Sequence, residues 1–127
     1  MTRQEYRVEG QAEPISHFTD AVRAGDLLYV SGIVGVDGDG SLVGGDDVVA
    51  QTRHVFENMR AVLAVAGCGF EDVVKVTVFL TDDDRPLINP VREEVFGATR
   101  PASTLVEVPR LAVEGAKVEI DCVAVVP

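Results

Sequence analysis

The chain has 127 residues, 46% of them apolar and 25% charged, and its 21 acidic against 11 basic residues give a formal net charge of −10. This length and composition exclude a disordered chain and predict one globular domain, 1–127. The charge argues against a nucleic-acid-binding protein, because such proteins need a basic surface to release counterions from phosphates.

Apolar runs such as 27–30 and 123–126 are far shorter than the roughly 20 residues of a membrane span. Residues 1–8 lack the apolar segment of a signal peptide. Cys68 and Cys122 form no Cys-x-x-Cys pair, and His17 and His54 lie far apart, so no zinc site is indicated. We expect a cytoplasmic protein with reduced thiols, and neither a metal, a nucleic acid nor a membrane among its partners.

The first predicted elements are two antiparallel strands, 21–23 and 27–31, joined by a turn at Gly25. Two Asp-Gly steps within 36–40 predict a hairpin or tight loop after the second strand.

Apolar residues at intervals of three and four predict a helix over 47–66. Asp46 or Asp47 can cap its start, and Gly67 is typical of a helix end. In the following strand, 73–81, alternation places Val74, Val76, Val78 and Leu80 on one face and Lys75, Thr77 and Phe79 on the other.

A second helix is predicted over 90–97, with Asn89 as its N-cap and Pro90 at its first position. Strands at 104–108 and 117–126 complete the order β-β-α-β-α-β-β, an α+β sandwich with two helices on one face of a mixed sheet.

The other face of this sheet stays uncovered, because two helices cover only one. A sheet face this apolar is expected to meet another subunit, so the chain should form an oligomer. The residues predicted on it are Lys75, Thr77, Phe79, Leu105, Glu119, Asp121, Val123 and Val125.

Several blocks, in their order along nearly the whole chain, resemble the reactive-intermediate deaminase (Rid) family, also called YjgF. The resemblance implies a chorismate-mutase-like (ferredoxin-like) fold and a homotrimer with clefts between subunits. For the best-known members it also implies hydrolysis of enamines and imines to ketones and ammonia without a cofactor. The blocks are 21–32, 51–53, 66–67, 72–81, Asn89, 96–97, 100–102 and 118–121.

The sequence departs from the family pattern where a substrate would bind. Members that deaminate imines of 2-keto acids carry, directly after Pro-Ala, an arginine that holds the substrate carboxylate through two parallel bonds. Ser103 stands at that position here, after Arg100-Pro-Ala. Ile33 replaces a glutamine, Phe18 a tyrosine, and His17 the proline before it. We therefore expect a cleft without its carboxylate clamp, for which ordinary 2-imino acids are poor substrates.

Asp121 matches the acidic residue that would orient water in the family. Imine hydrolysis needs water at a polarised carbon and a proton for the departing nitrogen, and a carboxylate with a raised pKa in a partly dry cleft can serve both steps. The alternative for Asp121 is an inter-subunit hydrogen bond or a solvated strand position. His17 is the second catalytic candidate, because an imidazole pKa of about 6.5 suits proton transfer near neutrality; the alternative is a surface loop histidine.

Ser31 and Gly32 can offer backbone groups to the cleft, glycine allowing close approach, or can simply end a strand. The hydroxyls of Ser103 and Thr104 suit hydrogen bonding more than nucleophilic attack, because no Gly-x-Ser-x-Gly elbow is present. Cys122 is predicted to face the helices. Substrate binding is assigned to Phe18, Ser31, Gly32, Ile33, Asn89, Ser103, Thr104 and Leu105.

Two functions of different class follow. The first is a Rid-type hydrolase or deaminase acting on a small imine or enamine in inter-subunit clefts of a trimer, without a cofactor. The alternative is a non-catalytic trimeric protein of the same fold that binds a small molecule or regulates a partner. A ribonuclease activity, also attached to this family by name, is disfavoured by the charge.

Overall fold

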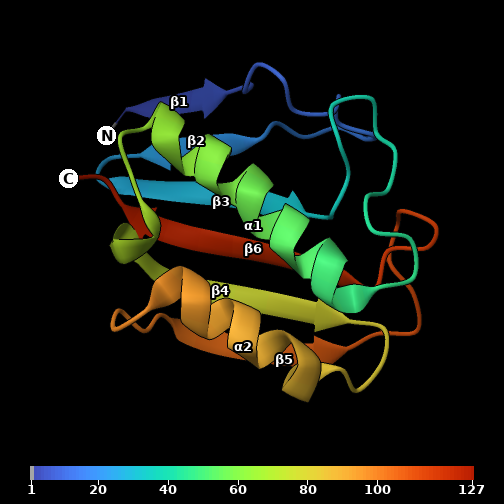
Figure 1. The fold of residues 1–127 in the computed structure, drawn as a ribbon. Helices are drawn as coiled ribbons and strands as arrows, with labels where there is room; N and C mark the ends of the chain where they lie inside the picture. The colour runs from blue at the N-terminus through green and yellow to red at the C-terminus, as the bar shows by residue number, and fades with distance from the viewer. Residues whose placement is uncertain (1) are drawn as a thin grey trace.

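Two α-helices pack on one face of a six-stranded sheet in the computed structural model, which describes residues 2–127 (Figure 1). The predicted α+β architecture is therefore confirmed. The helices are α1 (Val48–Val65) and α2 (Arg85–Phe96), and a 3-10 helix, η1 (Phe70–Asp72), precedes β4. The strands are β1 (Arg3–Tyr6), β2 (Ala21–Ala24), β3 (Leu27–Ile33), β4 (Val73–Leu80), β5 (Ala102–Glu107) and β6 (Val118–Val125).

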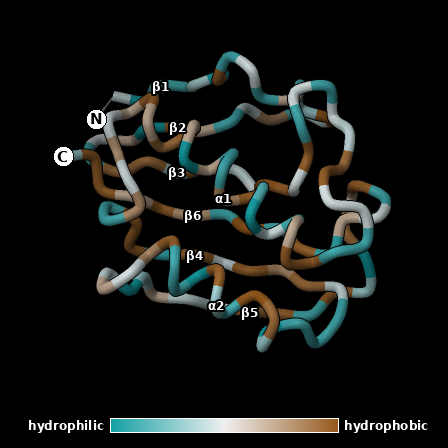
Figure 2. Tube along the Cα trace, viewed as in Figure 1, coloured by the Kyte–Doolittle hydropathy of each residue, from teal (hydrophilic) through white to brown (hydrophobic). Residues whose placement is uncertain are grey.

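The sheet has the strand order β1-β2-β3-β6-β4-β5, with β4 and β5 parallel and the other pairs antiparallel. Strand β1 was not predicted, because its side chains are exposed or half-exposed and show no apolar alternation. It joins the edge through backbone pairing with β2. The core lies between the sheet and the helices, and Figure 2 shows hydrophobic residues concentrated along β3, β6 and β4.

Helix α1 begins and ends where the sequence predicts. The Asp47 carboxylate accepts hydrogen bonds from the backbone N–H groups of Val49 at 2.9 Å and Ala50 at 3.3 Å, which caps the helix. Gly67 follows the helix with a φ of +75°, a conformation that favours glycine.

Helix α2 begins five residues earlier than predicted, at Arg85, so Asn89 and Pro90 lie inside it. The predicted N-cap at Asn89 is therefore wrong. The earlier start lets Ile88, one turn before the buried Val91, enter the core with no exposed surface. Because Pro90 has no backbone N–H, one backbone hydrogen bond is missing in the first half of the helix.

Two side chains lie on a different face from the one predicted. Val74 is 46% exposed because the β4–β6 register shifts between Val73 and Lys75, so Val73 takes the buried position. Leu105 packs against the core instead of the uncovered face, because the parallel pairing places it opposite the buried Val78.

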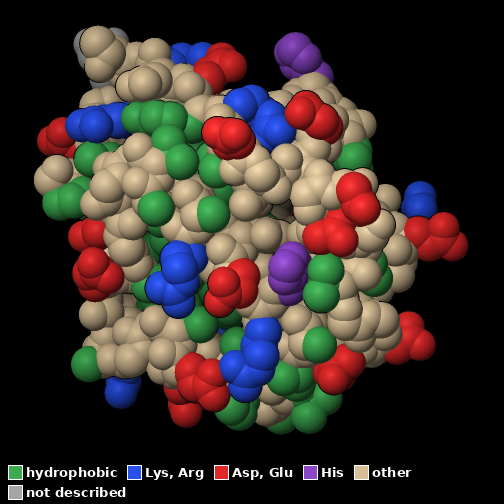
Figure 3. Space-filling model, turned by 45° about the horizontal axis from the view of Figure 1, so that its top comes forward, with side chains coloured by type: hydrophobic (Ala, Val, Ile, Leu, Met, Phe, Trp, Pro, Cys, Tyr) green, Lys and Arg blue, Asp and Glu red, His purple; other side chains and the backbone are tan. Residues whose placement is uncertain are grey.

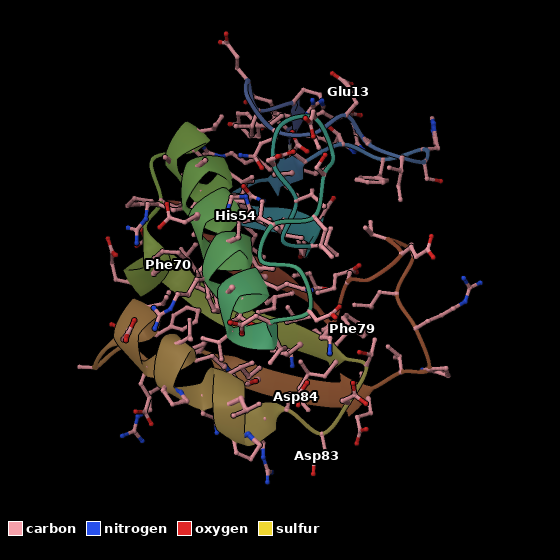
Figure 4. The ribbon with its side chains drawn as sticks, turned by 45° about the vertical axis from the view of Figure 1, so that its right-hand side comes forward. Glu13, His54, Phe70, Phe79, Asp83 and Asp84 are labelled. Atoms are coloured by element: carbon pink, nitrogen blue, oxygen red, sulfur yellow. The ribbon has the colours of Figure 1, made fainter. Side chains whose placement is uncertain are left out.

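Surface charge is distributed rather than clustered on the side that Figure 3 displays, where basic side chains lie among acidic ones. His54 is half-buried on α1 and its Nε2 lies 3.0 Å from the carbonyl of Val36 in the loop after β3 (Figure 4). Within residues 2–127, no helix is long and apolar enough to cross a membrane.

Gln51 is fully buried on α1 and joins two loops to the helix. Its amide nitrogen donates to the carbonyls of Gly45 at 2.7 Å and Gly115 at 3.1 Å, and its oxygen accepts from the N–H of Lys117 at 2.8 Å. The side chain therefore holds the loop before α1 against the loop before β6.

Gln51→Leu should lower the free energy of unfolding by about 3 kcal/mol, because it leaves several buried backbone groups without partners. Urea unfolding measures the change. Thr52→Val is the control, since the buried Thr52 hydroxyl donates only to Val48 within α1, and about 1 kcal/mol is expected for it. Equal losses in the two variants would contradict the role of Gln51 in joining the loops.

Candidate active site

A groove of about 440 Å³ lies beside the end of β3. Its walls come from residues 11–16 with Phe18, from residues 31–34 with Val36, and from the loop at 112–113. It brings together four of the predicted binding residues, and it also includes Glu119 of β6. Those four are Phe18, Ser31, Gly32 and Ile33.

The outer wall of the groove is held in place by Asp20. Its carboxylate forms an ion pair with Arg7 and accepts a 2.7 Å hydrogen bond from the N–H of Val8. Arg7 also contacts Glu13 at 3.3 Å, and Figure 4 shows Glu13 on this loop, next to the loop that follows β3. These contacts fix the loop that carries Phe18.

Ser31 and Gly32 lie at an irregularity of the sheet. The β3–β6 register shifts between Val30 and Ile33, which takes both residues out of regular pairing. The Ser31 hydroxyl donates to the carbonyl of Thr19 at 2.6 Å, which ties β3 to the wall of the groove.

Gly32 makes room for Glu119. A Cβ placed on Gly32 would lie 2.4 Å from Oε2 of Glu119, so a larger residue would displace this carboxyl group. Burial raises the pKa of the Glu119 carboxyl above its ordinary value, and the charge of Asp121 raises it further. The groove therefore contains a carboxyl group that holds its proton more strongly than a solvated one.

Asp121 lies two residues after Glu119 on β6, on the same, uncovered face of the sheet. It is half-exposed and pairs with Thr77 of β4. The charge of Asp121 opposes ionisation of the neighbouring Glu119 carboxyl, in addition to the effect of burial. Such a pair can accept a proton from water and donate another to a leaving group.

Glu119→Gln should stabilise the fold near neutral pH. Because the native-state pKa of Glu119 lies above the ordinary 4.5, the folded protein retains this proton to higher pH than the unfolded chain. Its free energy of unfolding therefore falls as pH rises through that window. The variant should melt at a higher temperature than the parent at pH 7, with no difference below about pH 4. If the variant melts at a lower temperature than the parent at pH 7, burial and the charge of Asp121 do not disfavour the ionised Glu119 carboxylate.

The remaining predicted binding residues lie elsewhere in the chain, on α2 and β5. Thr104 faces the uncovered side and accepts a 2.7 Å hydrogen bond from the Lys75 ammonium, whereas Ser103 and Leu105 face the helices. Asn89 is exposed on α2. Two strands separate β3 from β5, which at about 4.8 Å per strand places them roughly 14 Å apart. One chain therefore does not bring these residues to the groove.

Arg92 of α2 is a candidate that the sequence pattern did not reveal. Its Nη2 donates to the Ser103 hydroxyl at 2.8 Å, so a guanidinium lies beside position 103 although residue 103 is not arginine. Its spacing of three residues from Asn89, which places both on one helix face, was the available signal.

His17 is exposed, and the groove lining does not include it. Cys122 is buried on the helix side, as predicted, and burial raises the pKa of its thiol to about 12, which keeps it protonated. Within residues 2–127, no group of three His, Cys, Asp or Glu side chains is placed to hold a metal ion. The catalytic role of His17 stays a prediction.

Known proteins resemble this chain over nearly its whole length. The family model described as Endoribonuclease L-PSP matches residues 9–126. A RutC family protein of Pyrococcus horikoshii is 40% identical over 118 residues, which cover 91% of this chain and 92% of that protein. The 3-aminoacrylate deaminase RutC of Acinetobacter baylyi is 40% identical over 117 residues, with coverages of 91% and 92%.

A solved structure shows the same fold. The Rid-family protein of unknown function from Yersinia pestis has a TM-score of 0.91 and 33% identity, covering 98% of this chain and 100% of its own. This agreement confirms the chorismate-mutase-like arrangement of two helices on a mixed sheet. The chain therefore belongs to the Rid/YjgF family, whose model is described as Endoribonuclease L-PSP.

Proposed function

We propose that this protein is a deaminase that hydrolyses a small imine or enamine to a carbonyl compound and ammonia without a cofactor. The observation that carries the proposal is the Glu119 carboxyl in the groove, whose pKa is raised by burial and by the charge of the neighbouring Asp121, which itself lies outside the groove lining. The relative from Acinetobacter baylyi supports it, since 3-aminoacrylate is itself an enamine.

The chemistry requires one water and four proton transfers, two in the addition of water and two in the loss of ammonia. An ionised Asp121 accepts a proton from water while the oxygen adds to the imine carbon, and a carboxylic acid protonates the nitrogen. The carbinolamine nitrogen then takes the proton that Asp121 accepted from water and leaves as ammonia, while the carbinolamine hydroxyl gives its proton to the other carboxylate. This leaves a ketone and restores the original protonation state of both carboxyl groups. An enamine first takes a proton on carbon and loses one from nitrogen, and so enters the same route as an imine.

We further propose a homotrimer with the reaction in clefts between subunits. The groove and Asp121 lie at one part of the chain, whereas Ser103 faces the helices at the far edge of the sheet. A small substrate cannot contact both through the sheet, but the edge of a neighbouring copy can complete the groove. The resemblance supplies the number three.

The substrate range follows from the groups around the cleft. The expectation that ordinary 2-imino acids are poor substrates assumed that no guanidinium lies at position 103. Arg92 supplies one there, so our proposal is not restricted to substrates without a carboxylate.

Ammonia release tests the activity. Freshly generated 2-iminopropionate, its carboxamide counterpart and an aromatic imine should each be offered to the protein, with buffer alone as the reference. We expect release from at least one imine at a rate proportional to protein concentration. Release at the uncatalysed rate from all three would favour the non-catalytic binding or regulatory protein of the same fold.

We expect this reaction in the cytoplasm, because both cysteines are free and buried, which fits a reducing compartment.

A further inference from the structure

The groove beside β3 is lined by apolar side chains from three separate segments. Ile15 and Phe18 come from the loop before β2, Ile33 ends β3, and Val113 comes from the loop before β6. Ile15 is 69% exposed and Phe18 is 47% exposed, although both side chains are large and apolar. Exposed apolar side chains that share one groove form a patch, and such a patch marks a binding surface.

The polar side chains of the groove are largely engaged within the chain. Of the lining carboxylates, Glu13 and Asp20 form ion pairs with Arg7. The amide nitrogen of Asn58 donates to a carbonyl of the loop after β3 at 2.8 Å. Glu119 forms no ion pair with any residue of the described range 2–127. The Glu119 carboxyl therefore remains for a reacting centre, whereas the other lining carboxylates already have a cation.

The groove is also larger than a small imine requires. Its volume of about 440 Å³ lies within the roughly 300–1,000 Å³ that is typical of sites for drug-sized ligands. Two of its walls are the loop that carries Glu13 and the loop that follows β3, which lie next to each other in Figure 4. An imine of three carbons would leave most of these apolar walls in contact with water. Apolar atoms that replace this water gain binding free energy in proportion to the apolar surface that they cover.

We propose that the groove binds an alkyl or aryl substituent of the substrate, larger than methyl, against Ile15 and Phe18, while the imine carbon lies at Glu119. The inference rests on the proposed deaminase activity and names its substrate class: imines or enamines with a long apolar substituent. The departures from the family pattern agree with this class. Ile33 and Phe18 stand where the resemblance has a glutamine and a tyrosine, so both replacements remove a polar group from the groove.

The groove has a second possible occupant, an apolar side chain of a neighbouring copy. The substrate is favoured because the apolar walls are continuous with Glu119, and a side chain that filled the groove would cover this carboxyl group. The two occupants predict different consequences of making Ile15 polar. The preference for apolar ligands is lost in the first case, and the assembly is lost in the second.

Equilibrium binding of three 2-oxo acids tests the subsite without depending on turnover. Pyruvate, 2-oxohexanoate and 4-phenyl-2-oxobutanoate share one head group, whose contacts cancel in the ratios of their dissociation constants. Each buried methylene contributes up to about fourfold in affinity. By titration calorimetry, 2-oxohexanoate should therefore bind about tenfold or more tightly than pyruvate, and the phenyl compound at least as tightly as 2-oxohexanoate. Equal binding of the three acids, or no binding of the two larger ones, would overturn the proposal.

A pair of variants locates the preference in the groove. Ile15→Ser should reduce the preference for 2-oxohexanoate over pyruvate by about threefold or more. Val65→Ser is the matched control, because Val65 is an exposed apolar residue at the end of α1, on the opposite side of the sheet, and its preference should equal that of the parent. Equal changes in the two variants would overturn the proposal. Dissociation of the oligomer in Ile15→Ser alone would assign the groove to a neighbouring copy and would also overturn it.

Kinetics separates this inference from the proposed function. The kcat/KM for ammonia release should be about tenfold or more higher for the imine of 2-oxohexanoate than for 2-iminopropionate, and Ile15→Ser should reduce this ratio. Turnover without the preference would keep the deaminase activity and overturn the apolar subsite. Preferential binding of 2-oxohexanoate in a protein without turnover would support the subsite and reject the deaminase activity.

Discussion

Tyr29→Asp is expected to convert the assembly into monomers and to remove nearly all turnover. Tyr29 is 47% exposed in the chain and lies on the uncovered sheet face, where it is paired across β3 and β6 with Val123. Leu27 and Val125 form the next cross-strand pair on the same face. An aspartate buried there against another copy would lose its hydration without a partner, which costs several kcal/mol. Light scattering measures the mass, and ammonia release measures the turnover.

Val65→Asp provides the matched control. Val65 is 45% exposed, nearly the same as Tyr29, but it lies at the end of α1 on the opposite side of the sheet. This variant should keep both mass and turnover. A Tyr29→Asp protein that remains a fully active trimer would contradict the proposed assembly through the uncovered face.

Asp121→Asn should lower kcat for imine hydrolysis by about 10²–10⁴-fold, the range lost with a general acid–base group. Asparagine keeps the shape of the side chain but neither accepts a proton from water nor returns one to nitrogen. Because asparagine is also polar and nearly the same size, the assembly and its melting temperature should change little.

Glu107→Gln controls for the loss of one acidic charge, because Glu107 is an exposed carboxylate at the end of β5. It should keep the parent's kcat. Full activity in Asp121→Asn would instead assign the proton transfers to another group, with Glu119 first and His17 next.

Elements with local signals were predictable from the sequence. Helix α1 has an apolar stripe, a capping Asp47 and a following Gly67, so its bounds required no knowledge of the rest of the fold. The start of α2 was missed, because it depends on the burial of Ile88 in the core and not on a cap.

Pairing between distant segments limited the prediction of the sheet. Strand β1 has no apolar alternation and exists through its bonds to β2. The faces of β5 depend on its parallel register with β4, which no local pattern specifies, and so Leu105 was placed on the wrong side.

In the candidate site, too, features with a local sequence signal were predictable and contacts between distant elements were not. Phe18 and residues 31–33, which the sequence assigned to substrate binding, line one groove, because they belong to a single strand and its neighbouring loop; their role in binding stays a prediction. Glu119 and Arg92 were not singled out, because their importance arises from contacts across elements, with Gly32 and with Ser103 respectively.

Subunit mixing tests most directly whether the reaction occurs in a cleft shared by two copies of the chain. Asp121→Asn removes the acid–base group on the groove side, and Ser103→Trp obstructs the edge of the sheet, so each variant alone should be nearly inactive. Each cleft of a mixed trimer combines the groove of one copy with the edge of the next. Co-refolding equal amounts should therefore restore about a quarter of the parent activity, the fraction of clefts in which both sides are intact. A mixture no more active than the mean of the two variants, or a fully active Ser103→Trp protein, would contradict the shared cleft.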